Sequence, residues 1–322
     1  MKFSWKSFLK KHGKILALAP MDGWTDSAFR QIVKKISPEI LVFTEFVSVD
    51  GLTHRAASEK LFQKALAHDE IEKPLIVQLF GDEPEKFARA AEIVEKSGAA
   101  GVDLNFGCPA RRVLRSGHGA EILKNPKLAV EIFTAAKSAT NLEISVKTRL
   151  GFFDRNEIFK FAEKLFSAGL KTLFLHGRTA AEKFTGRADW ETIFEVKKKF
   201  PEKIVVGNGD ICDLKSVRKV LRNCDGAMIG RAATANPWIF AEILSDGNFV
   251  APNLKQKTEL FLEFSRAKFA HKNRAGILEI RKFFAAFFRG FSGAKKFREK
   301  IFTAETIAEI EKICGEIGEI GS

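Results

Sequence analysis

The chain has 322 residues, of which 45% are hydrophobic and 29% are charged, and its formal net charge is +13 at pH 7. This composition is typical of a globular protein, and the longest apolar runs are only as long as a strand, so we expect no transmembrane helix. The four cysteines form no Cys-x-x-Cys pair and no cluster with histidine, which argues against a metal site and a disulfide framework. The lysine-rich segment up to Lys14 precedes no apolar stretch of signal-peptide length, so we expect a cytoplasmic protein.

Short β-rich runs alternate with helical stretches from residue 15 to about residue 243. Eight runs are predicted as strands, at residues 15–21, 40–46, 75–80, 101–106, 143–149, 172–176, 203–207 and 226–229. Five stretches between them have apolar residues at helical spacing, often after Pro, Asp or Asn: 85–97, 126–138, 156–168, 190–200 and 214–221. Eight such units predict an α/β fold, a (β/α)8 TIM barrel. A doubly wound sheet is the alternative, disfavoured because no Gly-x-Gly-x-x-Gly follows the first strand.

The pattern changes to helices only from about Asn253. We therefore predict a TIM-barrel domain over residues 1–250 and a smaller helical domain over residues 251–322. Five phenylalanines at helical spacing predict a core seam rather than a base-stacking surface: Phe283, Phe284, Phe287, Phe288 and Phe291. Between Arg266 and Lys300 there are eleven Lys and Arg residues against two Glu, a charge that is compatible with a nucleic-acid partner.

Polar residues follow most of the predicted strands, and in a barrel the strand ends converge on one pocket. Cys108 stands in a Gly-Cys-Pro turn, where a presented thiol can donate a proton or act as a nucleophile. The Gln78 amide suits the edge of a planar heterocycle, and Lys147 is placed to stabilise the anionic ring of a reduced flavin. In chain order the strand-end residues are Ala19, Pro20, Met21, Gln78, Asn105, Cys108, Lys147, Arg149, His176 and Arg178.

The last two strands end in small residues. Asn208, Gly209 and Asp210 follow the seventh strand, and Gly230 and Arg231 follow the eighth. Exposed backbone N–H groups beside a guanidinium are typical of the phosphate-binding corner of barrels. Together, the strand ends indicate a phosphate-bearing cofactor with a polar ring, and flavin mononucleotide (FMN) fits that description.

The same residues resemble, in order, the motifs of the tRNA-dihydrouridine synthase family, particularly its bacterial B-type branch. The matching pieces are residues 18–26, 43–45, 77–81, 103–109, 146–149, 175–179, 207–210, 228–231 and 236–238. The resemblance implies a flavin-dependent barrel with a C-terminal tRNA-binding domain. Such an enzyme reduces the C5=C6 bond of specific uridines in tRNA to dihydrouridine, with NADPH as the electron donor, and needs neither a metal nor a membrane.

The resemblance also implies roles for individual residues. Hydride passes from reduced FMN to C6 of the uracil, and Cys108 donates the proton to C5. The FMN-binding residues would be Ala19, Pro20, Met21, Gln78, Lys147, His176, Asn208, Gly209, Asp210, Gly230 and Arg231. The substrate-binding residues would be Asn105, Arg178, Arg281 and Lys282. The target uridine must be flipped out of the folded tRNA to reach them.

Two residues after the cysteine depart from the family pattern: Glu121 replaces a small residue, and His118 is expected to be a solvated loop histidine. Three other functions compete with the resemblance. A dihydroorotate-type dehydrogenase would act on a free pyrimidine, which needs no basic surface such as residues 266–300. An RNA-binding protein without turnover would not need Cys108 and Lys147, and a phosphate-binding isomerase or synthase would leave Gln78 and Lys147 unexplained.

Overall fold

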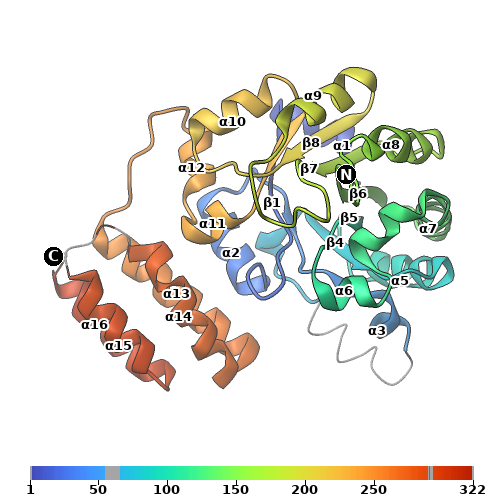
Figure 1. Cartoon of the computed structure of the whole chain (residues 1–322). Helices are drawn as coiled ribbons and strands as arrows, with labels where there is room; N and C mark the ends of the chain where they lie inside the picture. Colours follow the sequence, from blue (N-terminus) through green and yellow to red (C-terminus); the bar gives the residue numbers. More distant parts are fainter. Residues whose placement is uncertain (1, 55–65, 289, 291–292, 321–322) are drawn as a thin grey trace.

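The computed structural model describes residues 2–54, 66–288, 290 and 293–320. Its strands form one sheet in which every neighbour is parallel, in the order β1-β9-β8-β7-β6-β5-β4-β2, with β3 also on β4 (Figure 1). The sheet closes between β1 and the residue before β2, because Ala17 bridges Leu41. The strands are β1 Ile15–Leu18, β2 Val42–Phe43, β3 Val47–Ser48, β4 Leu75–Phe80, β5 Gly101–Phe106, β6 Glu143–Arg149, β7 Thr172–His176, β8 Ile204–Asn208 and β9 Gly226–Ile229. The fold is therefore a TIM barrel, and the doubly wound alternative is wrong.

Three predicted strands differ from the structure, and the smallest difference is in the run 203–207, which is shifted by one residue to β8 Ile204–Asn208. The run 40–46 appears as two short strands, β2 and β3, but the interruption stays attached to β4. There Thr44 N–H donates to the Ile76 carbonyl at 2.9 Å, and the Thr44 hydroxyl accepts from Gln78 N–H at 3.0 Å. The run 15–21 ends as a strand at Leu18, shortly before Pro20, which has no N–H to donate to a neighbouring strand.

Helices lie between the strands and pack their apolar faces on the outside of the sheet (Figure 1). Several begin at a side-chain cap, as where Asp26 accepts from Phe29 N–H and Asp213 forms a reciprocal capping box with Ser216. The segments are α1 Trp5–His12, α2 Ser27–Ile36, α3 Val49–Thr53, η2 Glu70–Glu72, α5 Pro84–Lys96, α6 Arg111–Arg115, η3 Gly119–Lys124, α7 Pro126–Ala139, α8 Glu157–Ser167, α9 Trp190–Lys199, α10 Leu214–Leu221, α11 Arg231–Ala235 and α12 Ile239–Leu244.

The barrel interior is a small apolar core that helix α1 completes. Trp5 of α1 is 1% exposed and contacts Phe174 of β7, with ring centroids 5.5 Å apart. Phe174 in turn contacts Phe43 of β2 at 5.1 Å. Because α1 immediately precedes β1, it covers the amino end of the barrel and leaves the carboxyl ends of the strands for a site.

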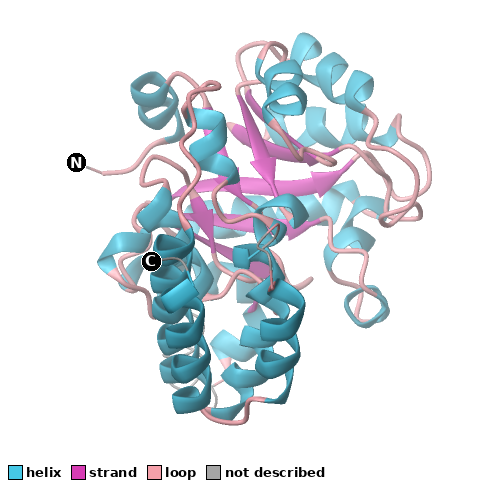
Figure 2. Cartoon of the chain, turned by 90° about the vertical axis from the view of Figure 1, so that its left-hand side faces the viewer, coloured by secondary structure: helices cyan, strands magenta, loops and turns pink. Residues whose placement is uncertain are grey.

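Four helices follow and form a separate sheaf beside the barrel (Figures 1 and 2). They are α13 Leu254–Lys272, α14 Arg274–Phe288, α15 Ala294–Thr303 and α16 Ile307–Ile320. The predicted phenylalanine seam is confirmed, since Phe283, Phe284, Phe287 and Phe288 are each at most 1% exposed. Phe291 lies outside the described residues. No helix in the described ranges is long and apolar enough to cross a membrane.

A buried ion cluster joins this sheaf to the barrel. Lys268 of α13 is fully buried, and its ammonium lies 2.7 Å from an Asp26 carboxylate oxygen at the start of α2. Lys272 lies 3.1 Å from the same carboxylate. Glu279 of α14 completes the cluster, 3.1 Å from Lys268 and 2.9 Å from Lys272. Two cations and two carboxylates therefore fix the long helices against the turn that follows β1.

Candidate active site

A buried hydrogen-bond chain connects the carboxyl halves of β4, β5 and β6. The Gln78 amide nitrogen donates to Asp103 at 2.7 Å, and the Asn105 amide nitrogen donates to the Gln78 oxygen at 2.9 Å. The Ser145 hydroxyl donates to the other Asp103 oxygen at 2.6 Å. Burial raises the pKa of Asp103 to about 6, although both donors oppose that shift. The chain fixes the orientation of two amides whose residues were predicted to lie in the site.

The Cys108 turn is held from three sides. The Asn105 side-chain oxygen accepts from the N–H groups of Gly107 at 3.1 Å and Cys108 at 2.9 Å. The Arg149 Nε donates to the Gly107 carbonyl at 2.8 Å. Gly119 packs behind the turn with a φ of +63°, and a Cβ there would lie 2.8 Å from the Cys108 carbonyl oxygen. Burial raises the pKa of the partly exposed Cys108 thiol, so the group remains protonated at neutral pH and can serve as an acid.

Lys147 stands on β6 opposite Asn105 of β5 in the strand register. Burial, and next the neighbouring Arg149, lower its pKa to about 8, against the effects of Asp103 and Cys108. Among the described residues, its ammonium forms no hydrogen bond and no ion pair. A partly buried cation without a protein partner suits an anionic or carbonyl-rich ligand.

His176 and Arg178 interact at the end of β7. The Arg178 Nη1 lies 3.3 Å from His176 Nε2, and burial together with the surrounding cations lowers the pKa of His176 far below its usual value. Because a guanidinium only donates, this contact makes Nε2 the acceptor of a neutral imidazole. Arg178 itself is 1% exposed and also donates to the carbonyls of Thr185 and Gly186. All three guanidinium nitrogens therefore have partners inside the protein, and the expected substrate contact is not available to Arg178 in this conformation.

The expected phosphate corner lies at the ends of β8 and β9. Asn208 donates to the Met228 carbonyl at 2.8 Å, which joins the two strands at their last residues. Gly209 has a φ of +129°, and a Cβ there would lie 2.7 Å from the Ala188 side chain and 3.0 Å from the His176 ring. A Cβ at Gly230 would lie 3.1 Å from the Met21 sulfur. Gly209 therefore requires a bare backbone, whereas a side chain at position 230 would need the Met21 side chain to shift by a few tenths of an ångström.

Asp210 accepts from two arginines in this corner. It lies 2.6 Å from Arg178 and 2.9 Å from Arg231. Burial alone would raise the pKa of Asp210, but the hydrogen bonds from Arg178 and from Ala188 N–H outweigh burial and lower it. The Arg231 side chain is 62% exposed, so its guanidinium remains accessible to a ligand. Ala19 is buried, whereas Pro20 and Met21 are partly exposed on the segment after β1.

These features fit a flavin phosphate ester. The corner offers glycine backbone beside an exposed guanidinium, and Lys147, further along the strand ends, forms no ion pair with any residue that the structure describes. A negatively charged phosphate matches the first group, and a ring that gains negative charge on reduction matches the second. Within the described parts of the chain, no three His, Cys, Asp or Glu side chains gather as metal ligands.

The two helical candidates face different surroundings. Arg281 donates to the Ala304 carbonyl at 2.7 Å, and its buried Nε forms no hydrogen bond with another described residue. Lys282 is exposed and lies 5.6 Å from the centre of the Trp24 ring, at the junction with the barrel. Arg281 thus points into the helical sheaf, while Lys282 remains accessible to a partner.

Much of the predicted basic stretch is neutralised inside the sheaf. Arg266 pairs with Glu311, Lys300 pairs with Glu316, and Lys268 and Lys272 belong to the buried cluster. Arg289 lies outside the described residues. Among those described, the exposed cations Lys295, Lys296 and Arg298 of α15 form no ion pair. The charge available to an outside partner is therefore smaller than the sequence indicates and is concentrated on α15.

The expectation of a solvated His118 is wrong. Its side chain is 12% exposed, its Nε2 lies 3.2 Å from Asp82, and its ring packs edge-on against Phe80. Glu121 forms an ion pair with Lys124 at 2.6 Å. Both residues therefore stabilise the segment behind the Cys108 turn.

Sequence reasoning assigned no role to three residues that support the site. Asp103 and Ser145 anchor the amide chain, and Arg149 binds the cysteine turn. A signal was present for Asp103 and Ser145, because each is a polar residue between two apolar neighbours in a strand, whereas Arg149 was predicted only as a strand-end residue. The side chains of all three residues are buried, and buried polar groups in proteins are almost always hydrogen-bonded.

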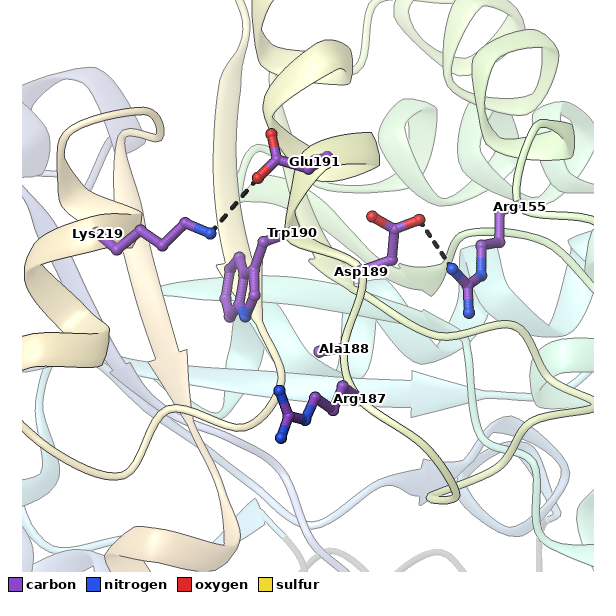
Figure 3. Close-up of a pocket in the computed structure, with 7 residues that line it drawn as sticks. All are labelled: Arg155, Arg187, Ala188, Asp189, Trp190, Glu191 and Lys219. Atoms are coloured by element: carbon purple, nitrogen blue, oxygen red, sulfur yellow. Dashed lines mark hydrogen bonds and ion pairs between the residues drawn. The ribbon is translucent and has the colours of Figure 1, made fainter.

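A pocket lies next to this region, between the loop after β7 and helix α10 (Figure 3). Arg155 pairs with Asp189 and Lys219 pairs with Glu191 across it, whereas Arg187 makes no ion pair with another described residue. The lining residues are Arg155, Arg187, Ala188, Asp189, Trp190, Glu191 and Lys219. None of them was among the predicted site residues.

Comparisons with known proteins agree with this arrangement. Residues 17–317 match the family model described as "Dihydrouridine synthase (Dus)". A probable tRNA-dihydrouridine synthase 1 from Synechocystis is 32% identical over 94% of this chain and 85% of its own length. A probable tRNA-dihydrouridine synthase from Aquifex aeolicus is 31% identical over 96% of this chain and 97% of its own length.

Solved structures share the fold at low identity. A 2-naphthoyl-CoA reductase in complex with 2-naphthoyl-CoA aligns with a TM-score of 0.58 at 10% identity, over 71% of this chain. A histamine dehydrogenase from Rhizobium sp. aligns with a TM-score of 0.57 at 14% identity, over 78% of this chain. The chain spans about half the length of each, 50% and 48% respectively, so the likeness concerns the barrel fold alone.

Proposed function

Since the chain belongs to the dihydrouridine synthase family, we propose that it reduces the C5=C6 bond of specific uridines in tRNA, with FMN as cofactor and NADPH as electron donor. The observation that carries the proposal is the placement of the Cys108 thiol, on a turn held by Asn105, at the same barrel opening as the Lys147 ammonium, which forms no ion pair with another described residue. An acid and a fixed cation are what the reduction of an activated double bond requires. The cytoplasmic location remains a prediction.

The cofactor would be held by residues from most of the strand ends. The backbone at Gly209 and Gly230 and the Arg231 guanidinium would bind the phosphate, while Lys147 and His176 would lie beside the ring. Gln78, which is buried with both ends of its amide hydrogen-bonded, would act by fixing the amide chain beneath the ring. A bound reduced flavin supplies the hydride that reaches C6 of the uracil. Lys147 holds positive charge beside the ring, and neutral His176 adds an imidazole edge without adding another charge.

The protein supplies the proton. The Cys108 thiol donates it to C5, so the double bond becomes a single bond with one hydrogen added to each carbon. Both polar ends of the Asn105 side chain are engaged, by Gln78 and by the cysteine turn. We therefore propose that Asn105 acts on the uracil through the position of Cys108. Arg149 holds the same turn from the neighbouring strand β6.

The substrate is a folded RNA, and its target base must leave the stack to enter the opening. The exposed cations Lys282, Lys295, Lys296 and Arg298 supply phosphate contacts that do not depend on sequence. Arg281 supports this surface from inside the sheaf, through its bond to the Ala304 carbonyl.

The first experiment is purification followed by a visible absorption spectrum and an assay. The expected result is a yellow protein that, with NADPH and unmodified tRNA under anaerobic conditions, forms dihydrouridine detectable by mass spectrometry. A protein that remains colourless and inactive after FMN is added would contradict the proposal. Flavin binding with turnover of a free pyrimidine instead of tRNA would favour a dehydrogenase.

Replacing Lys147 by methionine should make the bound flavin harder to reduce. The ammonium favours the anionic reduced ring, so its loss should lower the two-electron potential by about 30 mV for each 1.4 kcal/mol of lost stabilisation. Lys147 is charged below its pKa of about 8 and neutral above it, and a bound anion moves that loss of charge to higher pH. The difference between wild type and variant should therefore be full at pH 6.5 and should shrink as the solution becomes more alkaline. Redox titration against reference dyes checks this, and equal potentials at pH 6.5 would contradict it.

A further inference from the structure

Most of the exposed aromatic residues that the structure describes lie on loops at the barrel opening. Among the described residues, four aromatic side chains are largely exposed: Trp24, Phe153, Phe184 and Phe302. The first three follow β1, β6 and β7 directly, on loops at the carboxyl ends of the strands. A single exposed apolar residue is ordinary, but three aromatics around one opening indicate a shared partner.

Each aromatic at the opening has a cation beside it. Lys282 lies 5.6 Å from the centre of the Trp24 ring, and Lys124 lies 5.7 Å from that of Phe153. Phe184 has two, since the guanidinium carbons of Arg149 and Arg231 lie 5.4 Å and 5.6 Å from its ring centre. Alternating aromatic rings and cations are the features of surfaces that bind unpaired nucleic-acid strands.

Phe184 is the most firmly presented of the three. It is 57% exposed, yet both residues that flank it are held by buried arginines. The Arg149 Nη1 donates to the Lys183 carbonyl at 2.7 Å, and the Arg178 Nε donates to the Thr185 carbonyl at 2.9 Å. Lys183 also has a φ of +52°, an uncommon conformation for a side-chain-bearing residue. A loop fixed this closely that still leaves an aromatic ring in water is built to present the ring.

The same guanidinium ties Phe184 to the acid. Arg149 binds the Gly107 carbonyl with Nε and the Lys183 carbonyl with Nη1, so the residues before Cys108 and before Phe184 are separated by the width of one guanidinium group. Phe184 therefore lies beside the position where the target uracil is processed.

The charges around Phe184 match a polyanion. Lys183 and Arg187 are exposed on the same loop and form no ion pair with another described residue. Figure 3 shows the Arg187 side chain without a partner among the pocket residues, whereas Arg155 and Lys219 are paired. A base on the ring with phosphates near these cations would use both the apolar and the charged parts of the loop.

From these contacts we infer that Phe184 is a stacking platform for an unpaired nucleobase of the RNA, next to the uridine that enters the site. The inference rests on the proposed function, because it takes the substrate to be RNA. The stacked base limits how the chain on either side of the target can move. Phe184 is thus a specificity-determining residue of the opening and takes no part in the chemical step.

The test compares Phe184→Leu and Phe184→Tyr in the full-length, FMN-saturated protein. Affinity for a fluorescent, unmodified tRNA transcript is measured by anisotropy at several salt concentrations. Leucine keeps an apolar side chain but loses the ring, so we expect the Kd to rise roughly tenfold, while tyrosine should remain within about twofold of wild type. Ile71→Ala is the control, since Ile71 is 40% exposed in η2, just before β4 at the amino end of the barrel. It should bind tRNA like wild type.

The salt dependence separates stacking from an indirect loss of charge. Because Phe184 carries none, the slope of log Kd against log salt should be unchanged in Phe184→Leu, whereas Lys295→Ala should reduce it by about 0.7 to 0.9 if that lysine meets a phosphate. Wild-type affinity in Phe184→Leu, a reduced slope in that variant, or no recovery with tyrosine would overturn the inference. A difference in sedimentation between Phe184→Leu and wild type, both without RNA, would also overturn it, because it would show that the ring packs against a second copy of this chain. If the wild type binds tRNA without forming dihydrouridine, the proposed function fails while the binding comparison still decides the role of Phe184.

Discussion

Replacing Cys108 by alanine should reduce dihydrouridine formation by about 10²- to 10⁴-fold, the range that a positioned acid contributes. The turn should survive the change, because Asn105 and Arg149 hold backbone atoms rather than the sulfur. We therefore expect FMN and tRNA binding to be retained. Single-turnover conversion of tRNA by the pre-reduced enzyme measures the loss directly.

Cys212→Ala is the matched control for this experiment. Cys212 is an exposed free thiol in the segment between β8 and α10, outside the proposed machinery. The Cys212→Ala variant should convert tRNA at the wild-type rate. Because burial raises the pKa of Cys108, the wild type should also keep its proton-donating capacity as the pH rises from neutral into the mildly alkaline range. Equal rates in Cys108→Ala and wild type would show that another group donates the proton.

Replacing Lys268 by methionine should lower the free energy of unfolding by about 3 to 5 kcal/mol, because it leaves buried carboxylates short of a counter-charge. Asp26 is 4% exposed and would retain only Lys272, which Glu279 also uses. Urea denaturation followed by circular dichroism measures the change. Lys35→Met provides the comparison, since Lys35 joins the same two helices through an ion pair with Glu263 that is half exposed on both sides. It should cost less than about 1 kcal/mol.

The same cluster predicts a pH dependence with a definite sign. Burial alone would raise the pKa of Asp26, but Lys268 and Lys272 together lower it below the ordinary value of 3.8. A lowered carboxyl pKa gives stability that is present above the unfolded value and is lost as the pH falls through the folded value. Wild type should therefore lose this contribution only below about pH 3.8. Lys268→Met should begin to lose stability at a higher pH, and identical acid unfolding curves would contradict the assignment.

The central strands could be predicted closely from sequence. β4, β5, β6, β7 and β9 have the predicted bounds, because apolar residues with high strand propensity are bounded there by turn and cap residues. The second strand could not, since its interruption at Thr44 depends on a hydroxyl that replaces a backbone partner for Gln78. The division of the chain at residue 250 remains a prediction.

The site shows the same contrast between position and contact. The residues predicted at the strand ends lie at one opening, because the carboxyl ends of the strands of a parallel barrel all point to the same side. The partners of Arg178 and Arg281 could not be foreseen, since they are carbonyls of Thr185, Gly186 and Ala304 whose directions depend on the folded loops. The charge count of residues 266–300 overestimated the positive charge available to a partner for a similar reason. Glu311 and Glu316, on another helix, pair with two of the counted cations. The roles of the individual site residues remain predictions.

The ion cluster fixes the position of the helical domain relative to the barrel opening, which matters for a large partner that contacts both. Asp26 belongs to the turn that also carries Met21 and Trp24, so the long helices are tied to the opening itself and not to the outer wall of the barrel. The distance from the exposed cations of α15 to Cys108 is therefore fixed when the chain folds. For the RNA substrate proposed above, we expect the reacting uridine to be the one that lies at that distance from the phosphates bound by these cations. A uridine selected by this distance would be chosen without contacts that recognise the sequence of the RNA.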